Sequence, residues 1–352
     1  MRYGGNATCP RSPGATGRGA NRQCAGPALC FGPPWEPNLA MQPELQHFAD
    51  PSDAVAPADA ASITSDETSD TDLILADAFE WLATAEPASI HAVVTDPPYG
   101  LVEYQPDQLD KRKNGSGGVW RIPPSFDGAQ RNPVPRFTVL TPAEEAGLQQ
   151  FFSRLAPLLM RVLVPGAHVF IATNPLLSHH VYGPMLATGF EKRGEIVRIV
   201  KTLRGGDRPK GAHEEFPDVS VMPRSGWEPW GLFRKPVEGR VQDNLRRWGV
   251  GGLRRISDEQ PFWDIITCPP ASKAERAIAP HPSLKPQRLM RQITRAALPL
   301  GVGTILDPFM GSGSTIAAAQ ANGLHAVGIE ASSEYHEMAR RAVPLLAQWK
   351  DD

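Results

Sequence analysis

The sequence predicts an α/β fold in which helices cover both faces of a mostly parallel sheet. Short apolar runs alternate regularly with helical patterns from residue 72 onward. The runs are continuous rather than alternating, as in strands that are buried on both faces. Several of them end in an acidic residue, at Asp77, Asp96, Asp307 and Glu330. Because open α/β sheets bind ligands beyond the carboxyl ends of their strands, these acids predict a polar binding rim.

The elements follow one another in a simple order. The first two strands, "LILAD" and "AVVTD", flank a short helical pattern, and a long amphipathic stretch then leads to "HVFIAT". The last two strands, "TILDP" and "AVGIE", flank a helix that begins at a glycine-rich turn. By hydrophobic periodicity we expect strands at 73–77, 92–96, 168–173, 196–201, 304–308 and 326–330, and helices at 79–85, about 142–163, 178–188, 285–298, 314–322 and 333–348.

Residues 1–70 differ in composition from the rest of the 352-residue chain. The first part is rich in Gly, Pro, Arg and Ala, and the second part is acidic, small and polar. Neither part can bury enough apolar surface to offset the entropy lost on ordering, so we predict a disordered leader before a catalytic domain at 71–352. Met41 is an alternative start, and a functional tail is the other interpretation of this segment.

The composition excludes several classes of protein. A hydrophobic content of 41% and a charged content of 21% are typical of a soluble globular protein. No apolar run approaches the roughly 18–20 residues that span a bilayer, so we expect no membrane partner. Cys9, Cys24, Cys30 and Cys268 form neither a CxxC pair nor a zinc-ligand spacing. They predict no metal site, no disulfide framework and a reducing, cytoplasmic location.

The stretch "ILDPFMGSGSTIAAAQANG", 305–323, reads as a strand, a glycine turn and a helix. Gly311 and Gly313 allow the backbone to approach a ligand closely, although a glycine pair alone also fits an ordinary tight turn. No Lys follows the last glycine, so the turn is not a Walker phosphate loop. The next strand ends in Glu330, where an acid can bind ribose hydroxyls. The segment therefore predicts a nucleoside site without a phosphate cradle.

The stretch "HAVVTDPPYG", 91–100, ends an apolar strand in a rigid corner. Pro97 and Pro98 lack backbone donors and cannot continue a central strand. The corner presents the carboxylate of Asp96, a proline carbonyl and the ring of Tyr99. Two acceptors and a stacking surface suit a planar base that bears an amino group and has been flipped out of a duplex.

Taken together, these motifs resemble those of a known family of enzymes. "DPPYG" and "LDPFMGSGST" look like the two signature motifs of the DNA amino-methyltransferases that use S-adenosylmethionine. "LILADAFEWL" and "HPSLKPQRLMRQI" resemble two further motifs of that family. The corner precedes the glycine motif by about 210 residues, which resembles the β group of the family. The resemblance covers about 72–345 and implies a Rossmann-like methyltransferase sheet with a circularly permuted motif order.

The resemblance also implies the roles of particular residues. Asp96, Pro97, Pro98 and Tyr99 would form the catalytic corner. The cofactor S-adenosylmethionine would be bound by Asp77 at its adenine, Glu330 at its ribose, Asp307, Phe309, Gly311 and Gly313 at its methionine part, and by Lys285, Pro286, Ser314 and Thr315.

The target base is predicted from the head of the catalytic corner. Family members with Asp in this position mostly methylate the amino group of adenine, whereas Ser usually marks cytosine, so Asp96 favours adenine. Cytosine-N4 methylation stays open, and an RNA methyltransferase or a non-catalytic DNA-binding relative are weaker alternatives. We expect direct methyl transfer that depends on positioning, without a covalent intermediate.

DNA binding is predicted from basic residues that lie near aromatic ones. The segment 201–283 has weak periodicity and is the expected inserted target-recognition region. Its basic cluster consists of Arg234, Lys235, Arg240, Arg246, Arg247, Arg254 and Arg255. A second basic loop, with Lys111, Arg112 and Lys113, follows the catalytic corner. Such residues suit contacts to phosphates, although a solvated loop is the alternative for both.

The partners follow from the resemblance. Double-stranded DNA is the expected substrate, and the family also admits a homodimer and a cognate restriction endonuclease. The recognition sequence cannot be read from the chain, because base readout depends on side-chain geometry in a variable region.

Overall fold

The computed structural model describes residues 71–98, 140–200, 209, 211–212, 214–221, 223 and 226–350, together with the strand residues 125–126 and 129–130. All of these belong to one unit, residues 65–352. The predicted leader at 1–70 lies outside the described residues, so its disorder stays a prediction.

The core of this unit is an eight-stranded sheet with the order β1-β10-β9-β2-β5-β7-β6-β8. The first five strands in this order run parallel to their neighbours, whereas β7 is antiparallel to both β5 and β6. The strands are β1 (Thr71–Leu75), β2 (Ile90–Thr95), β5 (Leu163–Ala172), β6 (Glu191–Ile199), β7 (Trp227–Arg234), β8 (Ile265–Thr267), β9 (Thr304–Asp307) and β10 (His325–Glu330). A separate hairpin pairs β3 (Ser125–Phe126) with β4 (Ala129–Gln130).

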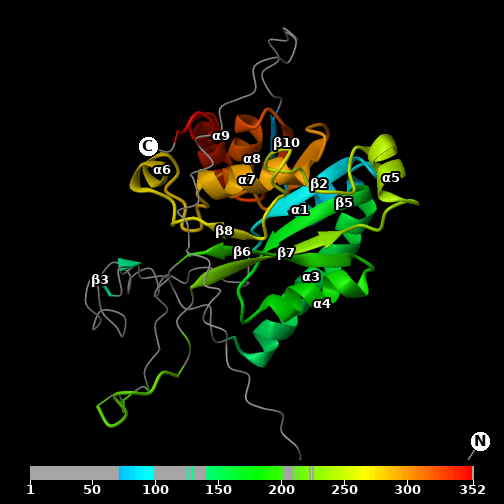
Figure 1. Ribbon diagram of the computed structural model, residues 1–352. Helices are drawn as coiled ribbons and strands as arrows, with labels where there is room; N and C mark the ends of the chain where they lie inside the picture. The colour runs from blue at the N-terminus through cyan, green and yellow to red at the C-terminus, as the bar shows by residue number, and fades with distance from the viewer. Residues whose placement is uncertain are drawn as a thin grey trace, which may run out of the picture. The chain divides into compact units, whose positions relative to one another are not determined.

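Helices cover the two faces of the sheet (Figure 1). One layer contains α7 (Gln287–Ala297), α8 (Ser314–Ala321) and α9 (Ser333–Ala347), which pack in succession. The other contains α1 (Ala78–Thr84), α3 (Pro142–Val162) and α4 (Ser178–Ala187). Every residue of β5 is buried, because both layers and two neighbouring strands surround it. None of the helices in the described part of the chain has both the length and the hydropathy needed to cross a membrane.

The predicted α/β fold is confirmed, and each expected strand and helix is found within a few residues of its predicted position. The sequence missed β7, β8, α5 (Val241–Trp248) and α6 (Lys273–Ile278). β7, "WEPWGLFR", was missed because Pro229 and Gly231 are typical strand breakers. Its glycine is required by packing, since a Cβ at Gly231 would lie 2.6 Å from the Tyr182 ring. Part of the segment 201–283 therefore lies inside the central sheet rather than in a separate insert.

The segment after β7 is anchored at the amino end of β5. Asn244 of α5 is almost fully buried, and its amide Nδ2 donates to the carbonyl oxygens of Pro165 (2.9 Å) and Val250 (2.7 Å). Its Oδ1 accepts the backbone N–H of Glu238 at 3.0 Å. This side chain pairs with three backbone groups, two of them buried, and thereby fixes α5 at the amino ends of the parallel strands, the end opposite to Asp96.

We expect Asn244→Ala to lower the free energy of unfolding by about 2–4 kcal/mol, because it leaves buried backbone groups without partners. Urea denaturation followed by circular dichroism measures this change. Arg240→Ala is the matched control on the same segment, because its exposed ion pair with Asp243 is worth about 0–1 kcal/mol. Equal stabilities of the two variants would contradict the anchoring role of Asn244.

Candidate active site

A cavity of about 340 Å³ opens at the carboxyl ends of β2, β9 and β10. It lies where the topology reverses, because the chain leads from β2 to β5 on one side and from β9 to β10 on the other. Such a reversal opens a crevice between neighbouring parallel strands. The cavity is large enough for a small organic ligand. Its lining includes Asp77, Asp96, Lys285, Asp307, Phe309 and Glu330.

Asp307 is buried at the end of β9 and connects this strand with β2. Its Oδ1 accepts the Thr95 hydroxyl at 2.8 Å and the Phe309 backbone N–H at 3.1 Å. Burial raises the pKa of Asp307 to about 6, although hydrogen bonds from Thr315, Thr95 and Phe309 act in the opposite direction. A carboxylate buried beside a cavity is suited to bind a cationic or hydroxyl group of a ligand.

The glycine turn after β9 is held against the end of β10. The backbone N–H of Gly311 donates to Glu330 at 3.0 Å, and that of Ser332 donates to the other oxygen of the same carboxylate at 2.8 Å. Gly313 has φ +83° and lies so close to α9 that a Cβ would collide with Val343. Only glycine combines this backbone conformation with this contact. The turn thus fixes Glu330 on the cavity wall, as the sequence predicted.

Further predicted cofactor residues surround the same cavity. Ser314 and Thr315 line the cavity from the first turn of α8, whereas Pro286, buried at the start of α7, is not among its lining residues. Asp77 lines the cavity and also caps α1, because it accepts the Phe79 backbone N–H at 2.8 Å. Most of the predicted cofactor residues therefore line one cavity, the exceptions being Pro286 and Gly313, and Asp77 has a structural contact in addition.

The sequence missed an aromatic part of the lining. The rings of His281 and Tyr335 meet edge to face, with centroids 4.5 Å apart, and both residues line the cavity. Burial, together with the charge of Lys285, lowers the pKa of His281 to about 4, so this imidazole is neutral at pH 7. The signal was present, because His281 begins the segment "HPSLKP".

The catalytic corner lies on the rim of this cavity. Asp96, Pro97 and Pro98 follow β2 directly and line the cavity, and Pro97 is buried. Tyr99 lies outside the described residues, as do Lys111, Arg112 and Lys113. Their predicted roles therefore stay predictions.

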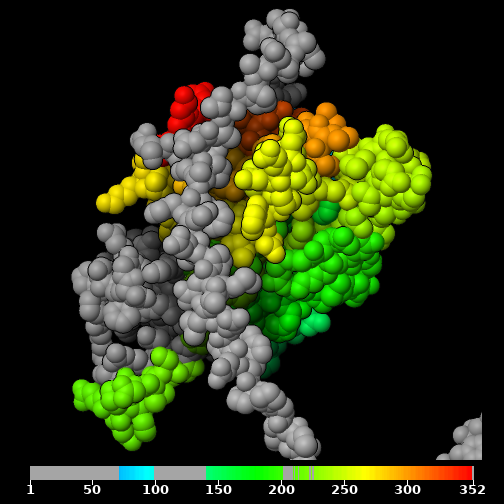
Figure 2. Space-filling model, in the orientation of Figure 1, coloured from blue at the N-terminus to red at the C-terminus, as the bar shows by residue number. Residues whose placement is uncertain are grey.

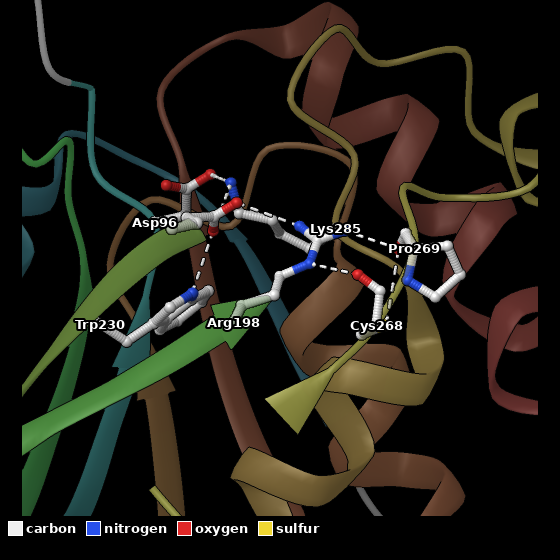
Figure 3. Close-up of polar contacts among 7 residues, drawn as sticks. Asp96, Arg198, Trp230, Cys268, Pro269 and Lys285 are labelled. Carbon is white, nitrogen blue, oxygen red and sulfur yellow. Dashed lines mark hydrogen bonds and ion pairs between the residues drawn. The ribbon is translucent and has the colours of Figure 1, made fainter. Parts of the chain in front are cut away.

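Lys285, which the resemblance assigns to the cofactor, lines the cavity and also lies beside the predicted catalytic corner. Its Nζ is 2.6 Å from Oδ2 of Asp96 and 3.5 Å from Oε1 of Glu228 (Figure 3). Burial by itself would lower the pKa of Lys285, but the carboxylates of Asp96 and Glu228 raise it above its usual value. The ammonium is therefore charged and shared by two acids.

The predicted DNA-binding arginines lie elsewhere. Arg240, Arg246 and Arg247 are exposed on or beside α5, which protrudes as the yellow-green segment at the right edge of Figure 2. The backbone N–H of Arg254 donates to Ala296 near the end of α7, and Arg255 is exposed next to it. This surface is at the amino ends of the strands, whereas Asp96 is at a carboxyl end.

Two residues of the basic cluster have internal partners. Arg234 is buried, and its guanidinium donates to Glu191 at 2.6 Å and to the Gly251 carbonyl at 2.9 Å. The Lys235 amine donates to the carbonyls of Met160 (2.8 Å) and Leu163 (2.7 Å), at the end of α3. Because their charged groups bind partners within the fold, we do not assign phosphate contacts to Arg234 and Lys235.

The fold and the site together define a methyltransferase of Rossmann-like architecture. The cavity lies at the switch point of the sheet, and Asp96 and Pro97, which carry hydrogen-bond acceptors, are among its lining residues. The chain belongs to the N6/N4 DNA methylase family, because the family model described as DNA methylase matches residues 90–341.

Individual relatives agree with this membership. The Type II methyltransferase M2.DpnII of Streptococcus pneumoniae is 25% identical over 274 residues, which cover 76% of this chain and 88% of the relative. The DNA adenine methyltransferase YhdJ of Escherichia coli (strain K12) is 39% identical over 69 residues, or 20% of this chain and 23% of YhdJ. The solved structure of the PvuII DNA methyltransferase (cytosine-N4-specific) shares the fold, with a TM-score of 0.50, 13% identity and coverage of 81% of this chain and 88% of that chain.

The raised pKa of Asp307 predicts how stability depends on pH. Because the folded state binds this proton more tightly than the unfolded state, the unfolding free energy should fall as the pH rises from about 4 to about 6 and then level off. Asp307→Asn removes this contribution, so the variant should gain about 2–3 kcal/mol relative to wild type between pH 4 and pH 7.

Urea denaturation at several pH values measures this difference. Asp258→Asn, in an exposed loop, is the control that should follow the wild-type pH dependence. Parallel curves for wild type and Asp307→Asn would contradict the assignment.

Proposed function

We propose that the protein transfers a methyl group from S-adenosylmethionine to the exocyclic amino group of adenine in duplex DNA, at a specific sequence. The observation that carries this proposal is the shared cavity: Asp96 and Pro97 lie on the same cavity as Asp307 and Glu330. A group bound to Asp307 and Glu330 therefore shares one cavity with the acceptors proposed for the target base. Membership in the DNA methylase family supports the reaction type.

The described residues fit S-adenosylmethionine. The cofactor carries an ammonium group and ribose hydroxyls, which need carboxylate partners, and the cavity supplies Asp307 and Glu330. Its planar adenine needs flat or apolar walls, and Phe79 and Phe309 lie in the lining. A Cβ at Gly311 would approach the His281 ring at 3.2 Å, so glycine keeps the turn close to this aromatic wall. When bound, S-adenosylmethionine supplies an electrophilic methyl group.

The catalytic corner would prepare the amino group to receive the methyl group. Asp96 and the carbonyl of Pro97 can accept its two hydrogens, and acceptance of both draws the nitrogen lone pair out of conjugation with the ring. Nucleophilic attack then needs no covalent enzyme intermediate. Positioning of the reacting groups within one cavity can supply about 7–11 kcal/mol of the barrier reduction.

Adenine is favoured as the target by Asp rather than Ser at the head of the corner. The relative YhdJ is named a DNA adenine methyltransferase. Cytosine-N4 methylation is the competing outcome of the experiment below. We further propose a cytoplasmic location, a restriction–modification context, which the name of M2.DpnII as a Type II methyltransferase supports, and a homodimer.

The exposed arginines near α5 stay candidates for DNA contacts outside the target base pair. Their distance from the catalytic corner assigns them to the flanking backbone rather than to base readout. The basic loop with Lys111, Arg112 and Lys113 remains our proposal for contacts near the flipped base.

We expect the purified protein to transfer labelled methyl groups from S-adenosylmethionine to adenine in genomic DNA of unrelated origin. Nuclease digestion followed by mass spectrometry of the nucleosides distinguishes N6-methyladenine from N4-methylcytosine. Sequencing of the modified DNA gives the recognition site. N4-methylcytosine as the only product would refute adenine as the target, and absence of any product would refute the function.

Asp96→Ala should reduce methyl transfer by about 100-fold or more, because it removes an acceptor aligned with the reacting group. Calorimetry should show that it binds S-adenosylmethionine within about threefold of wild type, since the carboxylates of the cofactor pocket are intact. Glu337→Gln on the exposed side of α9 is the control with unchanged turnover. Normal turnover of Asp96→Ala would refute the catalytic corner.

A further inference from the structure

A network of largely buried charges lies beside the predicted catalytic corner, and two of its members come from β6 and β7. At its centre is Glu228 of β7. Oε1 of Glu228 accepts the indole N–H of Trp230 at 3.0 Å, and Oε2 lies 3.0 Å from NH1 of Arg198. Both donors are buried, with Trp230 fully enclosed and Arg198 only 4% exposed. These contacts fix the position of the Glu228 carboxylate.

Arg198 of β6 is itself held by a third part of the chain. Its Nε donates to the carbonyl of Cys268 at 3.1 Å, and NH2 donates to the carbonyl of Pro269 at 2.6 Å (Figure 3). These carbonyls directly follow β8, which pairs with β6. Because the guanidinium is planar, contacts on several of its edges define its orientation. Arg198 and Glu228 therefore form a rigid support rather than a mobile surface pair.

Lys285 lies between this support and the catalytic corner. Its ammonium is 2.6 Å from Asp96 and 3.5 Å from Glu228, so two carboxylates compete for one cation. Arg198 supplies the second positive charge, and the four groups together are neutral. The positive charges of Lys285 and Arg198 lower the pKa of Glu228 despite its burial, so its carboxylate is ionised at neutral pH.

This arrangement creates a conflict for the proposed reaction. Asp96 would have to accept a hydrogen bond from a neutral amino group of the target base while it binds an ammonium. A hydrogen bond from a charged donor is about twice as strong as one from a neutral donor. Without a further partner for Lys285, its ammonium would therefore stay on the Asp96 carboxylate and the target amino group would not displace it. Leaving a buried ammonium without a partner would also be costly. A second carboxylate within reach of Lys285 removes this obstacle.

We propose that Glu228 is a positioning residue for methyl transfer, which draws the Lys285 ammonium away from Asp96 as the target amino group binds. Arg198 and Trp230 hold Glu228 in place for this exchange. The inference rests on the proposed function and adds a role for residues outside both signature motifs. Glu228 acts through Lys285 and touches neither substrate nor cofactor in this scheme.

The first test is Glu228→Gln, which keeps the size of the side chain and an acceptor for Trp230 but removes the negative charge. We expect kcat for DNA methylation to fall about tenfold or more, because Lys285 then stays on Asp96. The Kd for S-adenosylmethionine should stay within about twofold, since the cofactor carboxylates are unchanged. An unchanged kcat, or a weakened cofactor affinity with normal kcat, would overturn the proposal.

The chain offers a matched control in Glu191→Gln. Glu191 and Arg234 form another ion pair between β6 and β7, at 2.6 Å, but at the opposite end of these strands. Loss of this pair should lower the melting temperature without changing kcat. If both Gln variants reduced kcat equally, the effect of Glu228 would be one of stability alone, and the proposal would fail.

A double-mutant cycle with Lys285→Met provides the readout that a structural role would not give. If Glu228 acts through Lys285, the double variant should have the kcat of Lys285→Met within about twofold, because the second change has nothing left to act on. Multiplied effects of the two single variants would overturn the proposal. If Glu228→Gln does not fold, Glu228→Asp replaces it in the same cycle.

Failure of the function and failure of this inference are distinguishable. A wild-type protein that methylates no DNA refutes the proposed function and this inference with it. An active wild type with additive effects in the cycle refutes the inference alone. If the product is N4-methylcytosine, the cycle is measured on that product and decides the inference in the same way.

Discussion

The hydrogen bond from the Thr95 hydroxyl to Asp307 joins β2 to β9 at the point on which the site depends. These two strands share only a short parallel pairing, Ala92 with Ile305 and Val93 with Leu306. Their chains then depart in opposite directions, which opens the crevice. The strand that bears the proposed catalytic corner and the strand that bears the glycine turn thus meet at one buried carboxylate. This contact holds the ends of the two strands together where they meet the cavity.

The acids at this rim differ in their burial and in their hydrogen-bonding and charged partners. Asp307 has little solvent and a raised pKa, whereas Glu330 is held by two backbone N–H groups. Asp96 shares its charge with Lys285. Similar side chains at neighbouring strand ends are therefore suited to different tasks, because their partners differ. The same reasoning explains a neutral His281 next to a charged Lys285.

The antiparallel strand β7 both extends the sheet and carries side chains that lie near the proposed catalytic corner. It extends the sheet beyond β5, and it also brings Glu228 and Trp230 behind the catalytic corner. The far end of β7 carries Arg234, which ties the strand to β6. One strand therefore stabilises the sheet at one end and contributes charge to the active rim at the other. Pro229 and Gly231 conceal this strand in the sequence, and the glycine is compatible with its position because the rings of Tyr182 and Phe233 occupy the space where a side chain would lie.

Local patterns in the sequence determined most of the fold and the residues of the cavity. Apolar runs, acids at strand ends, and the "DPPYG" and glycine motifs each depend on neighbours in the chain, so they could be recognised without a structure. The tertiary structure alone decided which distant charges meet. Arg198, Glu228 and Lys285 are separated by 30 or more residues, and only the order of β5, β7 and β6 brings them to Asp96. The fold places the arginines of α5 at the amino ends of the parallel strands, away from Asp96, although the sequence predicts that they contact the same DNA. The physical reason is that charge pairing acts through space, whereas a pattern records only proximity along the chain.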